Sequence, residues 1–404
     1  MRLLFCGFAA LTLLLTSLAD AQEAATPATQ PQETAIAAPQ LEGVRLVLPA
    51  DLWVVPGREL NLYFDNLVLA RDLRSLVFDV DCTKGRQDEE RWRFTPAETD
   101  VGDYELVLRV LDAQMQPLTE GKSALHVVPA SAGAGTSFTL LCVGDSLTNA
   151  SIYPQELWAL FGMEGEAKLK LIGTHHPIAA MPPEVVHEGY GGWAWQTFCT
   201  RWTEGTDPKA KSPFLTLVDG KPTLDFAKYC QTNSEGKAPD FITVLLGCND
   251  TFGAQEATIE TTIDTMFGYA DTLLAEFRRV GPQTRIGLLL LPPPAATQDA
   301  FGTNYNCGQT RWQYRRNQHR VVERMIAKFG GREAEGIWLL PAHVNLDTVN
   351  NYPTVTGPAN ARSQVQVARL NNGVHPSADG YRQIADTIYC WLKAQLAAKP
   401  AAPQ

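Results

Sequence analysis

The sequence predicts an α/β domain with a parallel sheet over residues 137–397, preceded by a small all-β sandwich over residues 42–130. In the longer region, apolar runs of strand length alternate with amphipathic stretches of helical length, which is typical of a sheet covered by helices. In the shorter region, brief apolar or alternating runs follow one another with turn residues between them. With 404 residues, 45% of them hydrophobic and 19% charged, the chain is globular and long enough for two domains.

The first 21 residues have the features of a secretory signal peptide. Arg2 gives a positively charged start, residues 3–15 form an apolar core, and Ala19 and Ala21 fit a small-x-small cleavage site. Residues 22–41 are rich in Ala, Pro, Thr, Gln and Glu, a composition typical of a disordered linker. We therefore expect an exported protein, periplasmic or extracellular, and no later stretch is long and apolar enough to be an integral membrane segment.

The all-β region is expected to contain no helix, because no segment with helical periodicity lies between its strands. These strands are predicted over residues 44–48, 60–64, 76–80, 104–111 and 125–128. Asp100 to Tyr104 resembles the tyrosine corner of immunoglobulin-like sandwiches, which predicts an immunoglobulin-like domain. Leu106 stands where an antibody-type domain would have its second cysteine, so no disulfide between the sheets is expected. Residues 131–135 are rich in Gly, Ala and Ser and form a flexible boundary.

The α/β region alternates five predicted strands with four predicted helices. The strands cover residues 138–143, 169–172, 241–246, 286–291 and 337–340, and the helices cover residues 153–161, 259–279, 311–329 and 378–397. A parallel sheet of this kind places its functional site outside the carboxyl ends of the strands. The segments that directly follow these strands are therefore the candidates for reactive side chains.

The charge and the cysteines exclude several classes of function. A net charge of −10 and a pI near 5.3 argue against non-specific nucleic-acid binding, which needs a basic surface. The chain lacks the glycine patterns of phosphate-binding and dinucleotide-binding loops. Of its 8 cysteines, Cys6 lies in the predicted signal peptide, so 7 remain and cannot all be paired. Cys142 and Cys248 follow apolar runs and are expected to be buried thiols.

No metal or other cofactor is expected. The sequence has no closely spaced Cys-x-x-Cys pair. His175, His176 and His187 could suggest a metal, but their spacing does not match a pair of ligands on one helix. Nothing in the sequence specifies an oligomeric state.

Four segments with reactive or polar side chains fall at the predicted strand ends or at the start of the last helix. They are residues 144–147 (Gly-Asp-Ser-Leu), residues 187–193 (His-Glu-Gly-Tyr-Gly-Gly-Trp), residues 247–250 (Gly-Cys-Asn-Asp) and residues 372–377 (Asn-Gly-Val-His-Pro-Ser). In order and spacing they resemble the four blocks of the SGNH (GDSL) hydrolase superfamily, over about residues 137–396. The resemblance implies a three-layer α/β/α, flavodoxin-like domain that acts as a serine hydrolase on ester bonds.

The resemblance also assigns roles that fit the chemistry of ester hydrolysis. Ser146 would attack the ester carbonyl, and His375 would take the serine proton and give it to the leaving alkoxide. The backbone N–H groups of Ser146 and Gly192 and the side-chain amide of Asn249 would form the oxyanion hole. The second block contains two adjacent glycines, and aligning it with the family pattern assigns the oxyanion role to Gly192 rather than to Gly191. Asp145 and Asp250 are expected to support their loops through hydrogen bonds to the backbone.

One position departs from the family pattern. The family usually has an aspartate three residues before the histidine, and here that position is Asn372. An amide can accept a hydrogen bond from the imidazole but cannot stabilise an imidazolium with a full charge. Two alternatives remain: a Ser–His dyad whose ring is oriented by Asn372 or a backbone carbonyl, or a substitute carboxylate, for which Asp347 is the candidate.

The substrate is predicted less directly. A group of aromatic residues near the second motif and the fourth predicted strand could stack on sugar rings or belong to the core: Trp193, Trp195, Phe198, Trp202, Tyr305, Trp312 and Tyr314. The first alternative predicts an exported esterase that removes acetyl groups from a polysaccharide or glycan. A run of five arginines, Arg311, Arg315, Arg316, Arg320 and Arg324, is interpreted as a solvated helix face rather than as a site for an acidic polysaccharide.

Two other functions stay open at this stage. A lipase, lysophospholipase or thioesterase would use the same machinery with a longer acyl groove. A non-catalytic carbohydrate-binding protein would use the sandwich and retain a degenerate hydrolase domain. Asn249-Asp250-Thr251 also fits a glycosylation acceptor, and a glycan there would block the site, which favours a bacterial source.

Overall fold

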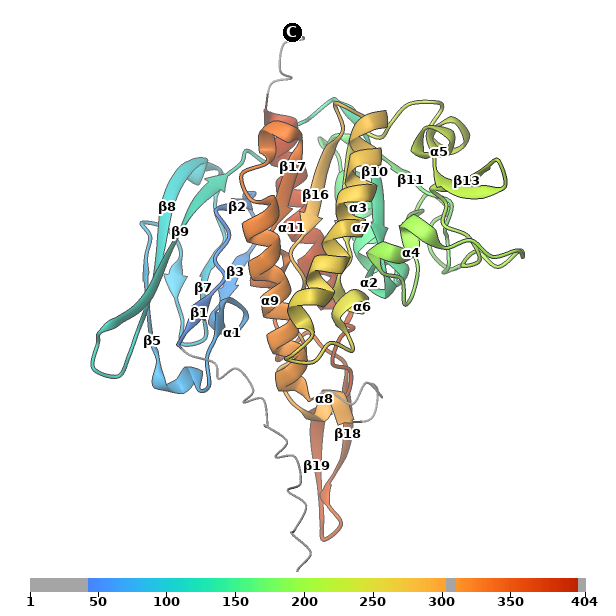
Figure 1. The fold of residues 1–404 in the computed structure, drawn as a ribbon. Helices are drawn as coiled ribbons and strands as arrows, with labels where there is room; N and C mark the ends of the chain where they lie inside the picture. Colours follow the sequence, from blue (N-terminus) through green and yellow to red (C-terminus); the bar gives the residue numbers. More distant parts are fainter. Residues whose placement is uncertain (1–42, 303–309, 399–404) are drawn as a thin grey trace, which may run out of the picture. The chain divides into compact units, whose positions relative to one another are not determined.

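The computed structural model describes residues 43–302 and 310–398, which belong to one compact unit of the chain (Figure 1). The predicted signal peptide and linker lie outside the described residues. Among the described residues, no helix is long and apolar enough to cross a membrane.

The α/β region contains the predicted parallel sheet. Its strands lie in the order β11 (Lys168–Ile172), β10 (Ser137–Gly144), β15 (Phe241–Leu245), β16 (Arg285–Leu289) and β17 (Ile337–Leu340), with β12 (Glu188–Gly189) paired to the end of β10. Every pair in this sheet is parallel. The chain passes from β10 outward to β11 and then crosses to β15, so the strand order reverses between β10 and β15. Such a switch point is where open α/β sheets form their sites.

Helices cover the sheet because its central strands are apolar on both faces. The four consecutive residues 140–143 of β10 have no exposed surface. The helix α3 (Ile152–Phe161) packs on α11 (Ala378–Ala397), while α7 (Ile259–Val280) packs on α9 (Arg311–Phe329), and α7 and α9 lie in front of the strands in Figure 1. Cys142 and Cys248 are buried, as the sequence predicted.

The all-β region forms two main sheets and one short pair of strands. The first sheet has the order β2 (Asp51–Val54), β9 (Pro117–Val127), β8 (Gly102–Leu111), β5 (Val77–Asp81); the second has β3 (Leu60–Tyr63), β7 (Arg91–Phe94), β6 (Arg86–Gln87); the pair is β1 (Arg45–Leu46) with β4 (Val68–Leu69). The Tyr104 hydroxyl donates to the carbonyl of Asp100 at 2.8 Å, which is the hydrogen bond of a tyrosine corner. The immunoglobulin-like assignment itself stays a prediction.

One expectation for this region was wrong, because it contains helical turns. The predicted strand over residues 60–64 ends at Tyr63, and Phe64–Leu67 forms the one-turn helix α1. The 3-10 turns Leu73–Ser75 and Glu98–Asp100 were also not predicted. Phe64, Asn66 and Leu67 are buried, so packing rather than periodicity selects this turn.

The arginine run is also corrected in part, because Arg315 is not solvated. Arg315 is 2% exposed and donates to the backbone carbonyls of Asp65 and Asn66. Burial lowers its pKa to about 10. The other four arginines of the run pair with carboxylates, namely Asp65, Glu256, Glu260, Asp264 and Glu323. Arg315 therefore connects this helix to the all-β region. The other four arginines form ion pairs.

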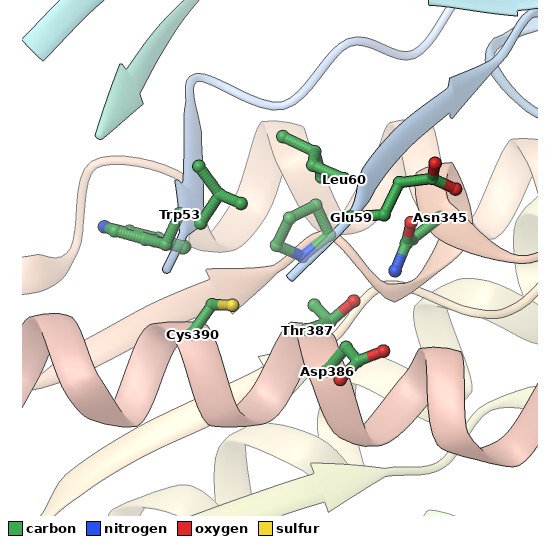
Figure 2. A pocket seen from close by; sticks show the side chains of 9 residues that line it. Trp53, Glu59, Leu60, Asn345, Asp386, Thr387 and Cys390 are labelled. Carbon is green, nitrogen blue, oxygen red and sulfur yellow. The ribbon is translucent and has the colours of Figure 1, made fainter. Parts of the chain in front are cut away.

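A small cavity lies between the β2–β3 segment and α11 (Figure 2). Trp53, Leu60, Asn345 and Cys390 are among the residues that line it, and its volume is about 10 Å³. A cavity of this size holds about one water molecule. It is therefore too small for a substrate.

Several elements have no counterpart in the predicted pattern. They are the hairpin β13 (Leu215–Val218) and β14 (Lys221–Leu224), the helices α4 (Trp195–Thr200), α5 (Phe226–Asn233), α8 (Asp299–Gly302) and α10 (Ala342–Asn345), the turn Glu333–Glu335, and the hairpin β18 (Thr354–Asn360) and β19 (Ser363–Leu370). The last hairpin extends away from the sheet near α8 (Figure 1). Most of its residues are exposed, so its sequence has no buried face to reveal it.

Candidate active site

Ser146 lies at the carboxyl end of β10, beside the switch point. β10 ends at Gly144, and a Cβ there would lie 2.0 Å from the Thr148 hydroxyl oxygen, so only glycine allows this tight turn. Ser146 then begins the one-turn helix α2 (Ser146–Asn149), which Asp145 caps by accepting the N–H of Leu147 at 2.9 Å. The turn leaves Ser146 half-buried at the edge of the sheet.

His375 lies directly against Ser146, although 229 positions separate them in the chain. The distance from His375 Nε2 to Ser146 Oγ is 2.7 Å. Burial lowers the pKa of His375. The imidazole is therefore neutral near pH 7, and it can accept the serine proton.

Asn372 shapes the segment that presents His375. Its side-chain oxygen accepts the backbone N–H of Val374 at 3.1 Å and that of His375 at 2.8 Å. Gly373 follows it, and a Cβ on Gly373 would lie 2.5 Å from the ring of Phe301. A tight turn closed by the Asn372 side chain thus fixes the backbone at His375.

The structure does not bring Asp347 to the histidine. The Asp347 carboxylate accepts the Asn350 N–H at 2.9 Å and the Tyr63 hydroxyl at 3.1 Å. Within the described part of the chain, no hydrogen bond joins Asp347 to His375. Asp347 instead supports its own turn and a contact with β3, so its hydrogen bonds give no support for Asp347 as the substitute carboxylate.

Asn249 contacts the turn that contains Ser146 and follows the strand on the other side of the switch point. It belongs to the one-turn helix α6 (Cys248–Thr251), directly after β15. Its Nδ2 donates to the carbonyl of Trp193 at 2.9 Å and makes a longer contact of 3.3 Å with Asp145 Oδ2. The amide therefore joins the loop after β12 to the turn that contains Ser146.

Gly191 and Gly192 complete this edge of the site. Gly192 has φ +84°, a conformation that favours glycine, and a Cβ on it would meet nothing within 4 Å. A Cβ on Gly191 would lie 3.9 Å from Ser146 Cβ. Gly191 is thus the residue that approaches Ser146, whereas backbone conformation rather than crowding requires glycine at position 192.

Of two aspartates beneath the site, Asp145 is buried and Asp250 is half-buried. Asp145 is 1% exposed, and burial followed by the charge of Asp250 raises its pKa to about 7. Burial likewise raises the pKa of Asp250 to about 7. Asp250 accepts the N–H of Trp195 at 3.2 Å, at the start of α4. Both carboxyl groups thus bind backbone N–H groups next to the predicted oxyanion residues.

The three histidines near the second motif have hydrogen-bond partners within the protein. His187 Nε2 lies 2.8 Å from Ser151 Oγ, His175 Nε2 lies 2.9 Å from Asn149 Oδ1, and His176 Nδ1 lies 2.9 Å from the carbonyl of Val185. Across residues 43–302 and 310–398, no three His, Cys, Asp or Glu side chains gather as a metal site.

Two residues that contact the loop after β12 were not singled out from the sequence. Glu188 is fully buried and accepts the N–H of Thr174 at 2.7 Å and the hydroxyls of Tyr190 and Tyr229 at 2.6 and 2.7 Å. It lies inside the second motif, where a carboxylate in the segment predicted to follow a buried strand could have signalled it. The side chain of Lys209 reaches Gly191 from a polar loop whose sequence gives no such signal.

The aromatic residues divide between the two alternatives. Four of them belong to the core, with exposed fractions of 7% or less: Trp193, Trp195, Phe198 and Tyr314. A carbohydrate-stacking role is therefore wrong for these four. Trp202 is partly exposed and Trp312 is 37% exposed. Tyr305 lies outside the described residues.

No protein-family model and no curated protein matches the sequence. Among solved structures, the chain is similar to a family 3 carbohydrate esterase from Clostridium thermocellum, at 16% identity and a TM-score of 0.40 over 65% of this chain and 100% of that one. It is similar to a carbohydrate acetylesterase family member from Sinorhizobium meliloti, at 15% identity and a TM-score of 0.38 over 65% and 100%. An acetyl esterase mutant with an acetate ion gives 16% identity and a TM-score of 0.37 over 64% and 98%. These likenesses are too distant to bear on the reaction.

Proposed function

We propose that the chain is a serine hydrolase of carboxylic esters that acts through Ser146 and His375. The observation that supports this most is the 2.7 Å contact between Ser146 Oγ and His375 Nε2 at the switch point of the sheet. A serine becomes a nucleophile when an adjacent base can take its proton. The lowered pKa of His375 keeps that base in its neutral form at neutral pH.

The first half of the proposed reaction forms an acyl-enzyme. Ser146 Oγ attacks the carbonyl carbon while His375 Nε2 takes the hydroxyl proton, and the carbonyl π electrons move to the oxygen. When the resulting tetrahedral intermediate collapses, the bond to the alcohol oxygen breaks and His375 returns the proton to that oxygen. In the second half, water takes the place of the serine, with His375 again as the base, and the free acid leaves.

We assign the oxyanion hole to three donors near this serine. They are the backbone N–H groups of Ser146 and Gly192 and the side-chain amide of Asn249. The 3.3 Å contact from Asn249 Nδ2 to Asp145 is long, so the amide can exchange it for a closer bond to an oxyanion. One such donor typically contributes about 3 kcal/mol to transition-state stabilisation.

The proposal treats the catalytic pair as a dyad without an aspartate. Asn372 accepts backbone N–H groups and thereby fixes the chain at His375. Asp347 has other partners. In this account Asn372 is a positioning residue, and no carboxylate is needed to charge-stabilise the imidazolium.

We further propose that the natural ester is an O-acetyl group on carbohydrate and that the protein is exported from a bacterial cell. The N-terminal sequence supports export. Partly exposed Trp202, in a groove beside the second motif, supports a sugar ligand.

The proposal is tested with p-nitrophenyl esters from acetyl to octanoyl, using the wild type, Ser146→Ala and Ser131→Ala. Ser131 is exposed and remote from the site, so it is the matched control. We expect hydrolysis that is highest for acetyl, is lost in Ser146→Ala and is kept in Ser131→Ala. A maximum at long acyl chains would favour a lipase or thioesterase. Inactivity of the wild type would favour a carbohydrate-binding protein.

A further inference from the structure

Lys209 places an ammonium group at the edge of the proposed active site. Its Nζ lies 3.4 Å from the carbonyl oxygen of Gly191 and 3.4 Å from the position of a Cβ on Gly191. The same Cβ position lies 3.9 Å from Ser146 Cβ. The ammonium nitrogen of Lys209 and the Cβ atom of Ser146 therefore both lie within 4 Å of this one point.

The charge of Lys209 is not neutralised by the surrounding described residues. Its backbone N–H donates to Asp207 at 2.7 Å, but in the described ranges no carboxylate lies within ion-pair distance of its Nζ. Its only hydrogen-bond acceptor there is the distant carbonyl of Gly191. The charge also acts on its surroundings: burial first, and then Lys209, lowers the pKa of His175.

A groove of about 660 Å³ adjoins this lysine. Its walls include His175, Tyr190, Trp202 and Lys211, and no Asp or Glu lines it. Lys211 stacks on the ring of Trp202 at 4.5 Å and pairs with exposed Glu204, so its charge is offset. Because Pro208 and Lys211 both line the groove, the chain segment that bears Lys209 forms one of its walls.

The groove and the lysine together favour an anionic sugar chain. Tyr190 lines the groove and is two residues from Gly192, so a ligand in the groove lies beside the proposed oxyanion loop. The partly exposed ring of Trp202 in this groove suits a sugar, and the ammonium of Lys209, which has no carboxylate partner among the described residues, suits a negative substituent on it. Lys209 is half-buried, and no carboxylate in residues 43–302 or 310–398 pairs with its ammonium group, although the chain has a net charge of −10.

We propose that the groove binds an anionic sugar that neighbours the acylated sugar in the glycan. During ester hydrolysis Lys209 pairs with the anionic group of this neighbouring sugar. This inference rests on the proposed function and specifies its substrate class as O-acetylated acidic glycans. Lys209 is then a specificity-determining residue. A hydrogen bond to a charged partner predicts a preference of roughly ten- to a hundredfold in kcat/KM.

The test compares acetate release from two forms of one glycan. The first is an O-acetylated galacturonic acid oligomer, and the second is the same oligomer with its carboxylates converted to primary amides. The ratio of kcat/KM for the two forms is measured for the wild type, Lys209→Gln and Lys209→Glu. Lys221→Gln, a change of an exposed lysine on β14, is the matched control.

We expect the wild type and Lys221→Gln to prefer the carboxylate form at least tenfold, Lys209→Gln to lose the preference, and Lys209→Glu to reverse it. The preference should weaken as ionic strength rises. A wild-type ratio near one would overturn the inference. If Lys209 only held the carbonyl of Gly191, its variants would lower both rates together and leave the ratio unchanged, which would also overturn it.

A parallel assay with p-nitrophenyl acetate separates the two proposals. Hydrolysis of this ester that depends on Ser146, without release of acetate from either oligomer, would overturn the acidic-glycan inference alone. Inactivity toward all three substrates would overturn the proposed function together with this inference.

Discussion

The side-chain oxygen of Asn372 accepts the backbone N–H of His375 at 2.8 Å. It also accepts the N–H of Val374, so one amide closes the turn that presents the imidazole to Ser146. An aspartate could accept the same two bonds. The asparagine therefore retains the turn while giving up the full negative charge that a third catalytic residue would supply.

The first prediction follows from this difference between positioning and catalysis. His375→Ala removes the base and should lower kcat/KM for p-nitrophenyl acetate by about 100- to 10,000-fold. Asn372→Ala removes two turn hydrogen bonds and should cost about tenfold. Asn372→Asp keeps both acceptors and serves as the conservative control, with activity within a few-fold of the wild type. Equal losses in the two alanine variants would show that Asn372 is part of the catalytic group.

The second prediction concerns pH. Burial lowers the pKa of His375, and the base must be neutral to act. The kcat/KM for p-nitrophenyl acetate should therefore rise with pH through an apparent pKa below 6.5, the ordinary value for histidine, and be level above it. His126→Gln, far from the site on β9, should leave this profile unchanged. If kcat/KM instead rose with an apparent pKa near 7, this would implicate Asp145 or Asp250, whose pKa values are raised to about 7.

The third prediction separates the two adjacent glycines. Gly192→Ala forces a side chain onto a backbone with φ +84°, so it should lower the free energy of unfolding by about 1 kcal/mol. The same strain displaces the proposed oxyanion N–H, so kcat/KM should fall by at least tenfold. Gly191→Ala meets only ordinary contacts and should change the free energy of unfolding by less than about 0.5 kcal/mol. Wild-type activity in Gly192→Ala would exclude Gly192 as a donor.

The fourth prediction concerns the buried carboxylate beneath the second motif. Glu188→Ala would leave the N–H of Thr174 and the hydroxyls of Tyr190 and Tyr229 without their acceptor. Urea unfolding should show a loss of about 3 kcal/mol or more. Glu184→Ala, an exposed change in the same loop, should lie within about 0.5 kcal/mol of the wild type. A loss below about 1 kcal/mol for Glu188→Ala would mean that water replaces the carboxylate.

Much of the α/β fold could be predicted from the sequence, because its elements bury a periodic apolar face. The helices Arg311–Phe329 and Ala378–Ala397 have the predicted bounds, and the strand Ile337–Leu340 does too. The hairpin Thr354–Asn360 and Ser363–Leu370 was missed because it is largely exposed. Arg315 was misplaced because backbone carbonyls from a distant segment, residues 65–66, satisfy its guanidinium, and no local pattern indicates such a contact.

The candidate site could likewise be predicted only in part. Ser146, Asn249 and His375 were named because each belongs to a motif at a strand end or a helix start. Their mutual contacts depend on the order of strands in the sheet, which the motifs do not specify. Lys209 could not be found, because only the path of a long polar loop brings its side chain to Gly191.

The central claim is that Ser146 is a nucleophile activated by His375. Its most direct measurement is the mass of the protein after reaction with a fluorophosphonate, followed by peptide mapping, because this reagent needs an activated serine and no particular acyl group. We predict one adduct, located on Ser146, that forms in Ser131→Ala, is absent from Ser146→Ala and forms far more slowly in His375→Ala. An unmodified Ser146 in the wild type, or an adduct on another serine that forms equally fast in His375→Ala, would contradict the account.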